Sequence, residues 1–301
     1  MEKQTRRLSD FFRVYAIAAA AVWSSCATAA PHNLSAVKFA IDGPKTEIVD
    51  GGIFKVTVQP NGSVTDVVGE FQGQVIEFYP EPGKSSYSAW VGVEYGTKSG
   101  DAEMKVRVRS GTGFSEEKID VAIKLGTYPS ETLAVAPRTV TPTKRDQKVI
   151  AKDRALLGKV YAAKTNNVYW DPPLVMPIQS DITSVYGSSR VYNGKKQNIH
   201  LGTDLRAKVG TPIRAPIKGK VVVARKLFYT GNTVIIDHGY GLFSVYGHLA
   251  KLKIKEGKII TKGQLMGLSG ATGRVTGPHL HWGFQLHGVK VDPMVLVQSL
   301  Q

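Results

Sequence analysis

The sequence predicts a mainly β protein in which one α-helix separates two β-rich parts. Apolar and polar residues alternate before residue 130, which is the period of half-buried strands. Apolar residues then recur at helical spacing between about 145 and 165, and short valine-rich runs follow after residue 171. The chain has 301 residues, which is enough to bury two separate hydrophobic cores.

The first β-rich part, residues 31–130, has the pattern of an antiparallel sandwich. Apolar residues alternate with polar ones over 104–109 and 119–125, as in strands with one buried face. Turn sequences such as Asn61-Gly62 and Asp-Gly punctuate similar runs, which lie near 36–41, 53–58, 74–79 and 88–94. We therefore expect an immunoglobulin-like antiparallel β-sandwich. No catalytic constellation occurs in it, so it could be a spacer, a docking surface or a cover over the second β-rich part.

A linker and a helix are expected over residues 131–168. The stretch from Thr127 to Pro142 is rich in Thr and Pro. Apolar residues from Val149 to Tyr161 then recur at helical spacing, which predicts one amphipathic helix over about 145–165. Such an apolar stripe usually packs against a neighbour, and we expect this linking α-helix to bridge the two β-rich parts.

Residues 1–30 have the features of a secretory signal peptide. Four basic residues precede an apolar stretch of ten, Val14 to Trp23, and a small-residue cleavage pattern follows at Ala27-Thr28-Ala29. Ten apolar residues are too few to cross a bilayer, which takes about 20, and no later stretch approaches that length. We expect an exported protein of the periplasm or the cell wall, without a transmembrane span. The single cysteine, Cys26, would be a lipidation site in a lipobox reading, but Trp23 fits that motif poorly, so ordinary cleavage is favoured.

Charge divides unevenly between the two parts. Residues 31–140 carry 11 Lys+Arg against 14 Asp+Glu, a net of −3, whereas residues 141–301 carry 24 against 8, a net of +16. A basic surface attracts polyanions, and for an exported protein these include carboxylate-rich wall peptides and anionic cell-wall polymers. Few aromatic residues interleave with the Lys/Arg clusters, and the leader indicates export, so we expect no nucleic acid partner.

Six of the seven histidines fall between residues 200 and 287. His279 and His281 are two apart, and a strand directs residues i and i+2 to the same face, so both can reach one ion or its bound water. His200 and Asp204 are four apart, and Gly202 between them favours a bent loop that enters a strand. Catalytic zinc takes three ligands of these types and keeps one position open for water.

These motifs resemble the lysostaphin-type (LytM, or β-lytic) zinc metallopeptidases, which cut peptide bonds in bacterial cell walls. The resemblance covers about residues 172–296. Its motifs are H-x-G-x-D at 200–204, Gly210-Thr211-Pro212, the run 231–239, Tyr246-Gly247-His248-Leu249, and Gly277 to Gly283. It implies a compact antiparallel β metallopeptidase domain over residues 169–301, with the metal in a groove on its face.

The resemblance also implies roles for five residues. His200, Asp204 and His281 would bind one Zn²⁺ per chain, and His248 and His279 would be catalytic. The sequence is thus interpreted as a secreted zinc metalloendopeptidase that hydrolyses peptide cross-links in peptidoglycan. The chain has no H-E-x-x-H motif, which excludes the helix-borne zinc protease.

Three alternatives to a zinc metalloendopeptidase fit parts of the sequence. A catalytically silent module that binds cell wall or activates an amidase is the main alternative, and the filled ligand positions weigh against it. A structural zinc site would usually have four ligands, often cysteines, which this chain lacks. A lipoyl-type carrier would need an exposed lysine at a hairpin tip, and no convincing one occurs. His238 and His287 lie in turn-like sequences and are not expected to be ligands.

Overall fold

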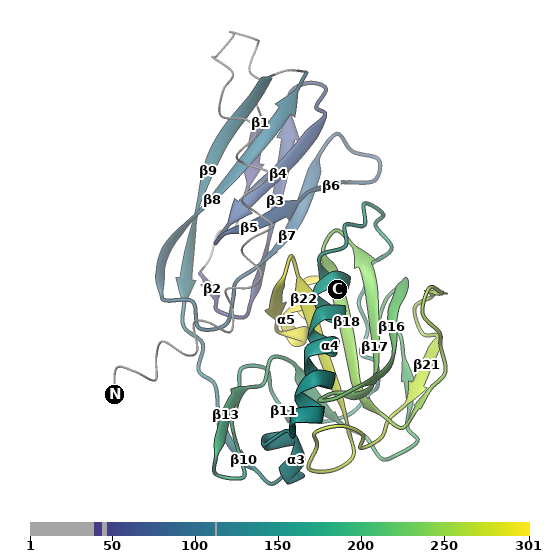
Figure 1. Ribbon diagram of the computed structural model, residues 1–301. Helices are drawn as coiled ribbons and strands as arrows, with labels where there is room; N and C mark the ends of the chain where they lie inside the picture. The colour runs from purple at the N-terminus through teal and green to yellow at the C-terminus, as the bar shows by residue number, and fades with distance from the viewer. Residues whose placement is uncertain (1–38, 44–46, 112) are drawn as a thin grey trace. The chain divides into compact units, whose positions relative to one another are not determined.

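The structure, a computed structural model, describes residues 39–43, 47–111 and 113–301 and is mainly β, as the sequence predicts (Figure 1). It divides into two compact units. The first contains Phe54–Val91, Gly100–Ala122 and the described residues up to Glu47, and the second contains Ile48–Ile53, Gly92–Ser99 and Ile123–Gln301. The predicted signal peptide, with Cys26, lies outside the described residues. Within the part of the chain that is described, no helix is both long and apolar enough to cross a membrane.

The first unit is built on two sheets. One has the order β1-β3-β7-β6, from β1 (Phe39–Asp42), β3 (Ile53–Pro60), β7 (Tyr87–Gly92) and β6 (Tyr79–Pro80). The other has the order β2-β9-β8-β4-β5, from β2 (Ile48–Val49), which the division assigns to the second unit, β9 (Gly113–Lys124), β8 (Gly100–Ser110), β4 (Asp66–Phe71) and β5 (Gln74–Glu77). The aromatic rings of Phe54 in β3 and Phe71 in β4 pack edge to face, with their centroids 5.4 Å apart. The predicted strands over 104–109 and 119–125 are thus confirmed, while the immunoglobulin-like arrangement stays a prediction.

Strand β4 has no counterpart among the predicted strands. Its sequence is Asp66-Val-Val-Gly-Glu-Phe71, where Gly69 interrupts the apolar and polar alternation. In the structure a Cβ at Gly69 would lie 2.6 Å from Cε of Met104, a fully buried side chain of the neighbouring strand β8. The glycine therefore makes room for a core methionine, and this removes the apolar residue that would have marked the strand.

The second unit centres on one large sheet with the order β11-β14-β22-β18-β17-β16-β20, and β23 pairs with β22. Its members are β11 (Ile182–Ser184), β14 (Thr203–Arg206), β16 (Gly219–Leu227), β17 (Gly231–Gly239), β18 (Leu242–Leu249), β20 (Ile259–Ile260), β22 (His279–Leu286) and β23 (Val289–Val291). The pairings described within this sheet are antiparallel. The valine-rich runs of the sequence form β16 and β17, where Val221, Val223 and Val234 are fully buried.

Two smaller sheets flank it. The first has the order β10-β12-β13, from β10 (Ser130–Leu133), β12 (Ser189–Tyr192) and β13 (Lys196–Ile199), and β10 runs parallel to β12. The second has the order β15-β21-β19, from β15 (Pro212–Arg214), β21 (Leu265–Leu268) and β19 (Lys251–Leu252). Residues 130–133, which the sequence assigned to the linker region, therefore form a strand of the second unit.

The predicted amphipathic helix is α4 (Lys144–Tyr161), and the short helices α3 (Pro137–Val140) and α5 (Pro293–Ser299) accompany it. Helix α4 begins with a capping box, in which the Thr143 hydroxyl accepts from the Asp146 N–H and the Asp146 carboxylate accepts from the Thr143 N–H. Figure 1 shows α4 lying across the large sheet. Its apolar stripe packs on Val223, Ile235 and Phe243 through a set of three residues, Leu157, Val160 and Tyr161. The role of this helix as a bridge between the two units stays a prediction.

Candidate active site

Three adjacent strands, β14, β22 and β18, bring the five predicted site residues together. The antiparallel register sets Asp204 of β14 opposite His281 of β22, and His279 lies two residues before His281 on the same strand. Gly247 of β18 pairs with His281, which places the next residue, His248, beside it. His200 precedes β14. The strand period therefore explains the H-x-H spacing, as the sequence predicts.

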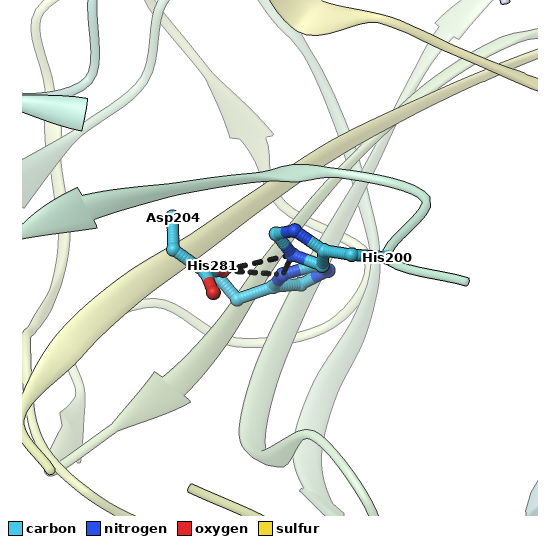
Figure 2. Close-up of side chains that lie close together, drawn as sticks. All are labelled: His200, Asp204 and His281. Atoms are coloured by element: carbon cyan, nitrogen blue, oxygen red, sulfur yellow. Dashed lines mark hydrogen bonds and ion pairs between the residues drawn. The ribbon is translucent and has the colours of Figure 1, made fainter. Parts of the chain in front are cut away.

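His200, Asp204 and His281 direct one ligand atom each to a common point (Figure 2). Asp204 Oδ1 lies 3.0 Å from His200 Nε2 and 2.9 Å from His281 Nδ1, and the two nitrogens are 3.0 Å apart. These atoms form a nearly equilateral triangle. Around a tetrahedral zinc with ligand distances of about 2.0–2.1 Å, neighbouring ligand atoms lie about 3.3 Å apart. The triangle has the size that such an ion needs.

The protonation of these three residues also suits a cation. His200 Nδ1 lies 3.1 Å from the Val185 carbonyl oxygen, which can only accept, so Nδ1 carries the proton and Nε2 keeps its lone pair. Burial lowers the pKa of His281 to about 4, so its imidazole is neutral at neutral pH. Burial by itself would raise the pKa of Asp204, but the contacts of its carboxyl group with His200 and His281 hold that pKa well below its usual range. A neutral imidazole and a carboxylate are the forms in which such side chains bind a metal.

His248 and His279 stand beside this triangle. The His248 ring centroid is 4.8 Å from that of His279 and 5.8 Å from that of His281, and His279 Nε2 lies 3.6 Å from Asp204 Oδ2. Each Nδ1 faces a backbone carbonyl oxygen, that of Thr272 at 2.8 Å from His248 and that of Gly277 at 2.9 Å from His279. Each Nδ1 therefore donates, and each Nε2 keeps a lone pair that can take up a proton.

The backbone of His248 is strained. Its φ is 63°, in the left-handed region that side chains other than glycine and asparagine rarely adopt. Two hydrogen bonds hold this conformation in place. The His248 N–H donates to the Thr230 carbonyl at 2.7 Å, and His248 Nδ1 bonds to the Thr272 carbonyl. Burial lowers the pKa of His248 to about 3, so it too is neutral. Strained backbone of this kind is concentrated at functional sites.

The two other histidines of this unit serve the fold. His238 is fully buried near the end of β17 with both ring nitrogens bonded, to the Lys218 carbonyl at 2.8 Å and to the Ser244 hydroxyl at 2.8 Å. It belongs to a strand rather than to the turn that the sequence suggested, because β17 continues to Gly239 and the turn begins at Tyr240. His287 lies between β22 and β23 with φ 46°, as expected for a hairpin turn.

The need for glycine at position 202 has a different physical reason from the one expected. Its φ is not in the left-handed region, so the glycine is not needed for an unusual bend. A Cβ at this position would lie 2.5 Å from Cε1 of His281 and 2.8 Å from the Trp282 carbonyl oxygen. The middle glycine of the H-x-G-x-D motif therefore leaves space for the imidazole that completes the triangle.

We predict that Gly202→Ala weakens metal binding by roughly tenfold or more, the effect seen when groups that orient metal ligands are altered. The new methyl group must displace the His281 ring, because the other close atom belongs to the backbone. Competition for zinc with a chromogenic chelator measures the change. Gly283→Ala is the matched control, since its Cβ would lie 3.6 Å from the nearest atom, an ordinary contact. Equal zinc affinity in Gly202→Ala and Gly283→Ala would contradict the steric role.

An ion-pair network lies behind Asp204. Arg190 donates from Nη2 to Asp204 Oδ2 at 2.6 Å and from Nε to Glu131 Oε2 at 2.9 Å. The Ser184 hydroxyl donates to Glu131 Oε1 at 2.5 Å. Glu131 was not singled out, because it stands 59 residues before Arg190 and reaches it only through the parallel pairing of β10 with β12.

Arg190 engages the outer oxygen of Asp204 and leaves Oδ1 directed at the two imidazoles. We therefore predict that Arg190→Gln lowers zinc affinity by about 10- to 100-fold, which is typical when the partner of a metal ligand is removed. Chelator competition again provides the measurement. Arg206→Gln is the control, because the ion pair of Arg206 with Asp181 is exposed, with side chains 70% and 79% accessible. A zinc affinity of Arg190→Gln within twofold of the parent would rule out this support.

Comparison with known proteins places the site in a family context. Residues 198–293, which include all five site residues, match the model described as "Peptidase family M23". A crystal structure described as a putative peptidase M23 from Pseudomonas aeruginosa is 30% identical, with a TM-score of 0.62, and the alignment covers 84% of this chain and 96% of that one.

Two characterised relatives match over the same part of the chain. The peptidoglycan DD-endopeptidase ShyA of Vibrio cholerae is 45% identical over 95 residues, 32% of this chain and 22% of that protein. The DD-carboxypeptidase/endopeptidase Mpg of Neisseria meningitidis is 38% identical over 96 residues, again 32% of this chain and 22% of that protein. The similarity to these relatives thus spans about a fifth of their own length.

Proposed function

The chain belongs to peptidase family M23, and we propose that it is an exported zinc metalloendopeptidase that hydrolyses peptide cross-links in bacterial peptidoglycan. The observation that carries the proposal is the triangle of His200 Nε2, Asp204 Oδ1 and His281 Nδ1, with the imidazoles of His248 and His279 at its side. The peptidoglycan DD-endopeptidases among the relatives support this choice of substrate.

In this proposal His200, Asp204 and His281 hold one Zn²⁺. When bound, the ion supplies Lewis-acid chemistry, which polarises the scissile carbonyl and acidifies a water molecule. Asp204 contributes the negative charge, and Arg190 fixes its orientation through Oδ2. The three ligands leave one tetrahedral position for a reactant, as in catalytic rather than structural sites.

His248 and His279 would be the side chains that assist the reaction beside the metal, through proton transfer and contact with the substrate. Both present Nε2 with a free lone pair, because their Nδ1 protons are committed to the carbonyls of Thr272 and Gly277. We assign His248 the role of taking a proton from the attacking water on Nε2 and returning it to the leaving amine as the C–N bond breaks, and His279 that of contacting the scissile group. A positioned imidazole of this kind typically contributes about 10²- to 10⁴-fold to a rate.

The remaining parts of the proposal concern location and partners. Export rests on the leader sequence of residues 1–30, and the basic charge of residues 141–301 suits carboxylate-rich wall peptides and anionic wall polymers. The first unit, which we propose to be immunoglobulin-like, would be a spacer, a docking module or a cover for the catalytic unit. Its strands contain no second cluster of metal-ligating side chains among the residues that are described.

The proposal is tested by digesting purified, cross-linked peptidoglycan and weighing the fragments. We expect new amino groups and monomeric muropeptides in place of cross-linked dimers, loss of this cleavage with a chelator, and recovery with added zinc. The fragment masses identify the bond that is cut. Unchanged dimers at stoichiometric zinc would favour the alternative, a catalytically silent wall-binding or amidase-activating module, and cleavage that a chelator leaves intact would contradict the zinc mechanism.

A further inference from the structure

Arg274 is stacked against two tyrosine rings close to the site. Its guanidinium carbon lies 4.3 Å from the ring centroid of Tyr192 and 4.6 Å from that of Tyr229. The side chain is half-buried, in the loop that leads to β22. Within the described part of the chain its guanidinium has no hydrogen bond and no carboxylate partner, in contrast to Arg190 and Arg225, which both pair with glutamates.

The backbone ties Arg274 to His248. The Arg274 N–H donates to the Tyr229 carbonyl at 2.8 Å, and the next carbonyl along the chain, that of Thr230, accepts from the His248 N–H at 2.7 Å. Two residues before Arg274, the Thr272 carbonyl accepts from His248 Nδ1 at 2.8 Å. Since consecutive Cα atoms are about 3.8 Å apart, Arg274 lies within about 8 Å of the residue that orients the His248 ring.

The stack also has a fixed relation to the metal ligands. Tyr192 and Arg190 are two apart on β12 and share one face of that strand, and Arg190 donates to Asp204. The rings of Tyr192 and Tyr229 are supplied by separate elements, β12 and the turn between β16 and β17, and both contact the guanidinium of Arg274. The guanidinium is therefore tied through Tyr192 to the strand that carries Arg190, and through the backbone to the segment that holds His248.

The chemistry of this arrangement suits a carboxylate. Stacking uses the faces of the guanidinium and leaves its N–H donors free in the plane, where they can bind a carboxylate with two parallel hydrogen bonds. The adjacent aromatic rings and partial burial strengthen such a bond by excluding water. A cation held rigidly, without an internal anion, next to a peptidase site is suited to an anionic group of the substrate.

We propose that Arg274, with Tyr192 and Tyr229, forms a subsite that binds a free carboxylate of the substrate's stem peptide next to the scissile bond. The inference rests on the proposed function, because it assumes a peptide substrate with carboxylates near its cross-link. It assigns Arg274 to substrate affinity and specificity, not to the metal and not to proton transfer.

The test uses the full, zinc-loaded chain and purified cross-linked muropeptide dimers, either with all carboxylates free or with one carboxylate at a time converted to the amide. We expect Arg274→Gln to raise KM about tenfold or more for the free-acid dimer while kcat changes by less than about threefold, consistent with the loss of a charge-assisted hydrogen bond. Amidation of one particular carboxylate should raise KM of the parent similarly and leave Arg274→Gln unaffected. Arg274→Lys, which keeps the charge, should recover part of the affinity.

Arg225→Gln is the matched control, since the Arg225 side chain is exposed and pairs with Glu256, and this variant should behave like the parent. The inference is overturned if Arg274→Gln has the parent's KM, or if amidation affects it as strongly as the parent. The amidated substrates can be compared on the parent protein alone. The inference therefore stays testable even if a variant misfolds.

A binding measurement separates this inference from the proposed function. Calorimetric titration of the metal-stripped chain with a free-acid muropeptide should give weaker binding for Arg274→Gln than for the parent, and equal binding would overturn the subsite. If the zinc-loaded parent cleaves none of the dimers, the proposed function fails, and the calorimetric result still decides the subsite.

Discussion

Replacing His281 by alanine is expected to abolish both zinc retention and peptide-bond cleavage. His281 Nδ1 forms two sides of the ligand triangle, 2.9 Å to Asp204 Oδ1 and 3.0 Å to His200 Nε2, so its loss leaves only two ligands. A catalytic zinc site takes three protein ligands, and two are not expected to retain the ion through purification. Elemental analysis of the purified variant and the release of amino groups from cross-linked peptidoglycan measure the two effects.

His287→Asn is a histidine control for this experiment. His287 lies in the turn between β22 and β23 with φ 46°, a conformation that asparagine tolerates, so the variant should keep zinc and activity. Thermal unfolding of both variants shows whether the fold persists. A folded His281→Ala protein that holds one zinc per chain would refute the ligand assignment.

Replacing His248 by alanine is expected to separate the two properties. Zinc should be retained, while turnover should fall by about 10²-fold or more. His248 contributes no atom to the ligand triangle, and its ring centroid is 5.8 Å from that of His281. Its imidazole is nevertheless oriented by Thr272 with Nε2 free, as a proton acceptor requires. Zinc content and the rate of amino-group release on the same preparation distinguish the two properties.

A second variant guards against a structural explanation. Because His248 has φ 63°, alanine is strained there, whereas His248→Asn removes the imidazole in a residue that accepts the left-handed region. Both variants should lose turnover with zinc in place. Loss of zinc in the folded asparagine variant, or a rate equal to the parent's, would argue against proton transfer by His248.

The parts of the site that depend on local periodicity could be predicted from the sequence. The spacing of His279 and His281 implies one face of a strand, and the structure places both on β22 opposite β14. The start of β14 at Thr203 agrees with a loop entering a strand after His200. The helical stripe from Val149 to Tyr161 likewise became α4, because its spacing is a local property of the chain.

The features that the sequence missed depend on contacts between distant segments. Glu131 supports Arg190 only because β10 pairs in parallel with β12, and no local pattern encodes that pairing. Gly202 is required by the imidazole of His281, 79 positions further along the chain, so its spatial role became visible only in the folded protein. The left-handed backbone of His248 likewise follows from its bonds to Thr230 and Thr272.

The central claim is that three side chains of this protein hold one catalytic zinc ion. Its most direct test is the zinc-to-protein ratio of the folded, purified parent chain, determined by elemental analysis together with cleavage of cross-linked peptidoglycan on the same sample. The account predicts one zinc per chain, with cleavage falling in proportion as a chelator removes the metal. A folded chain that cleaves the cross-links at full rate with no bound metal would contradict it.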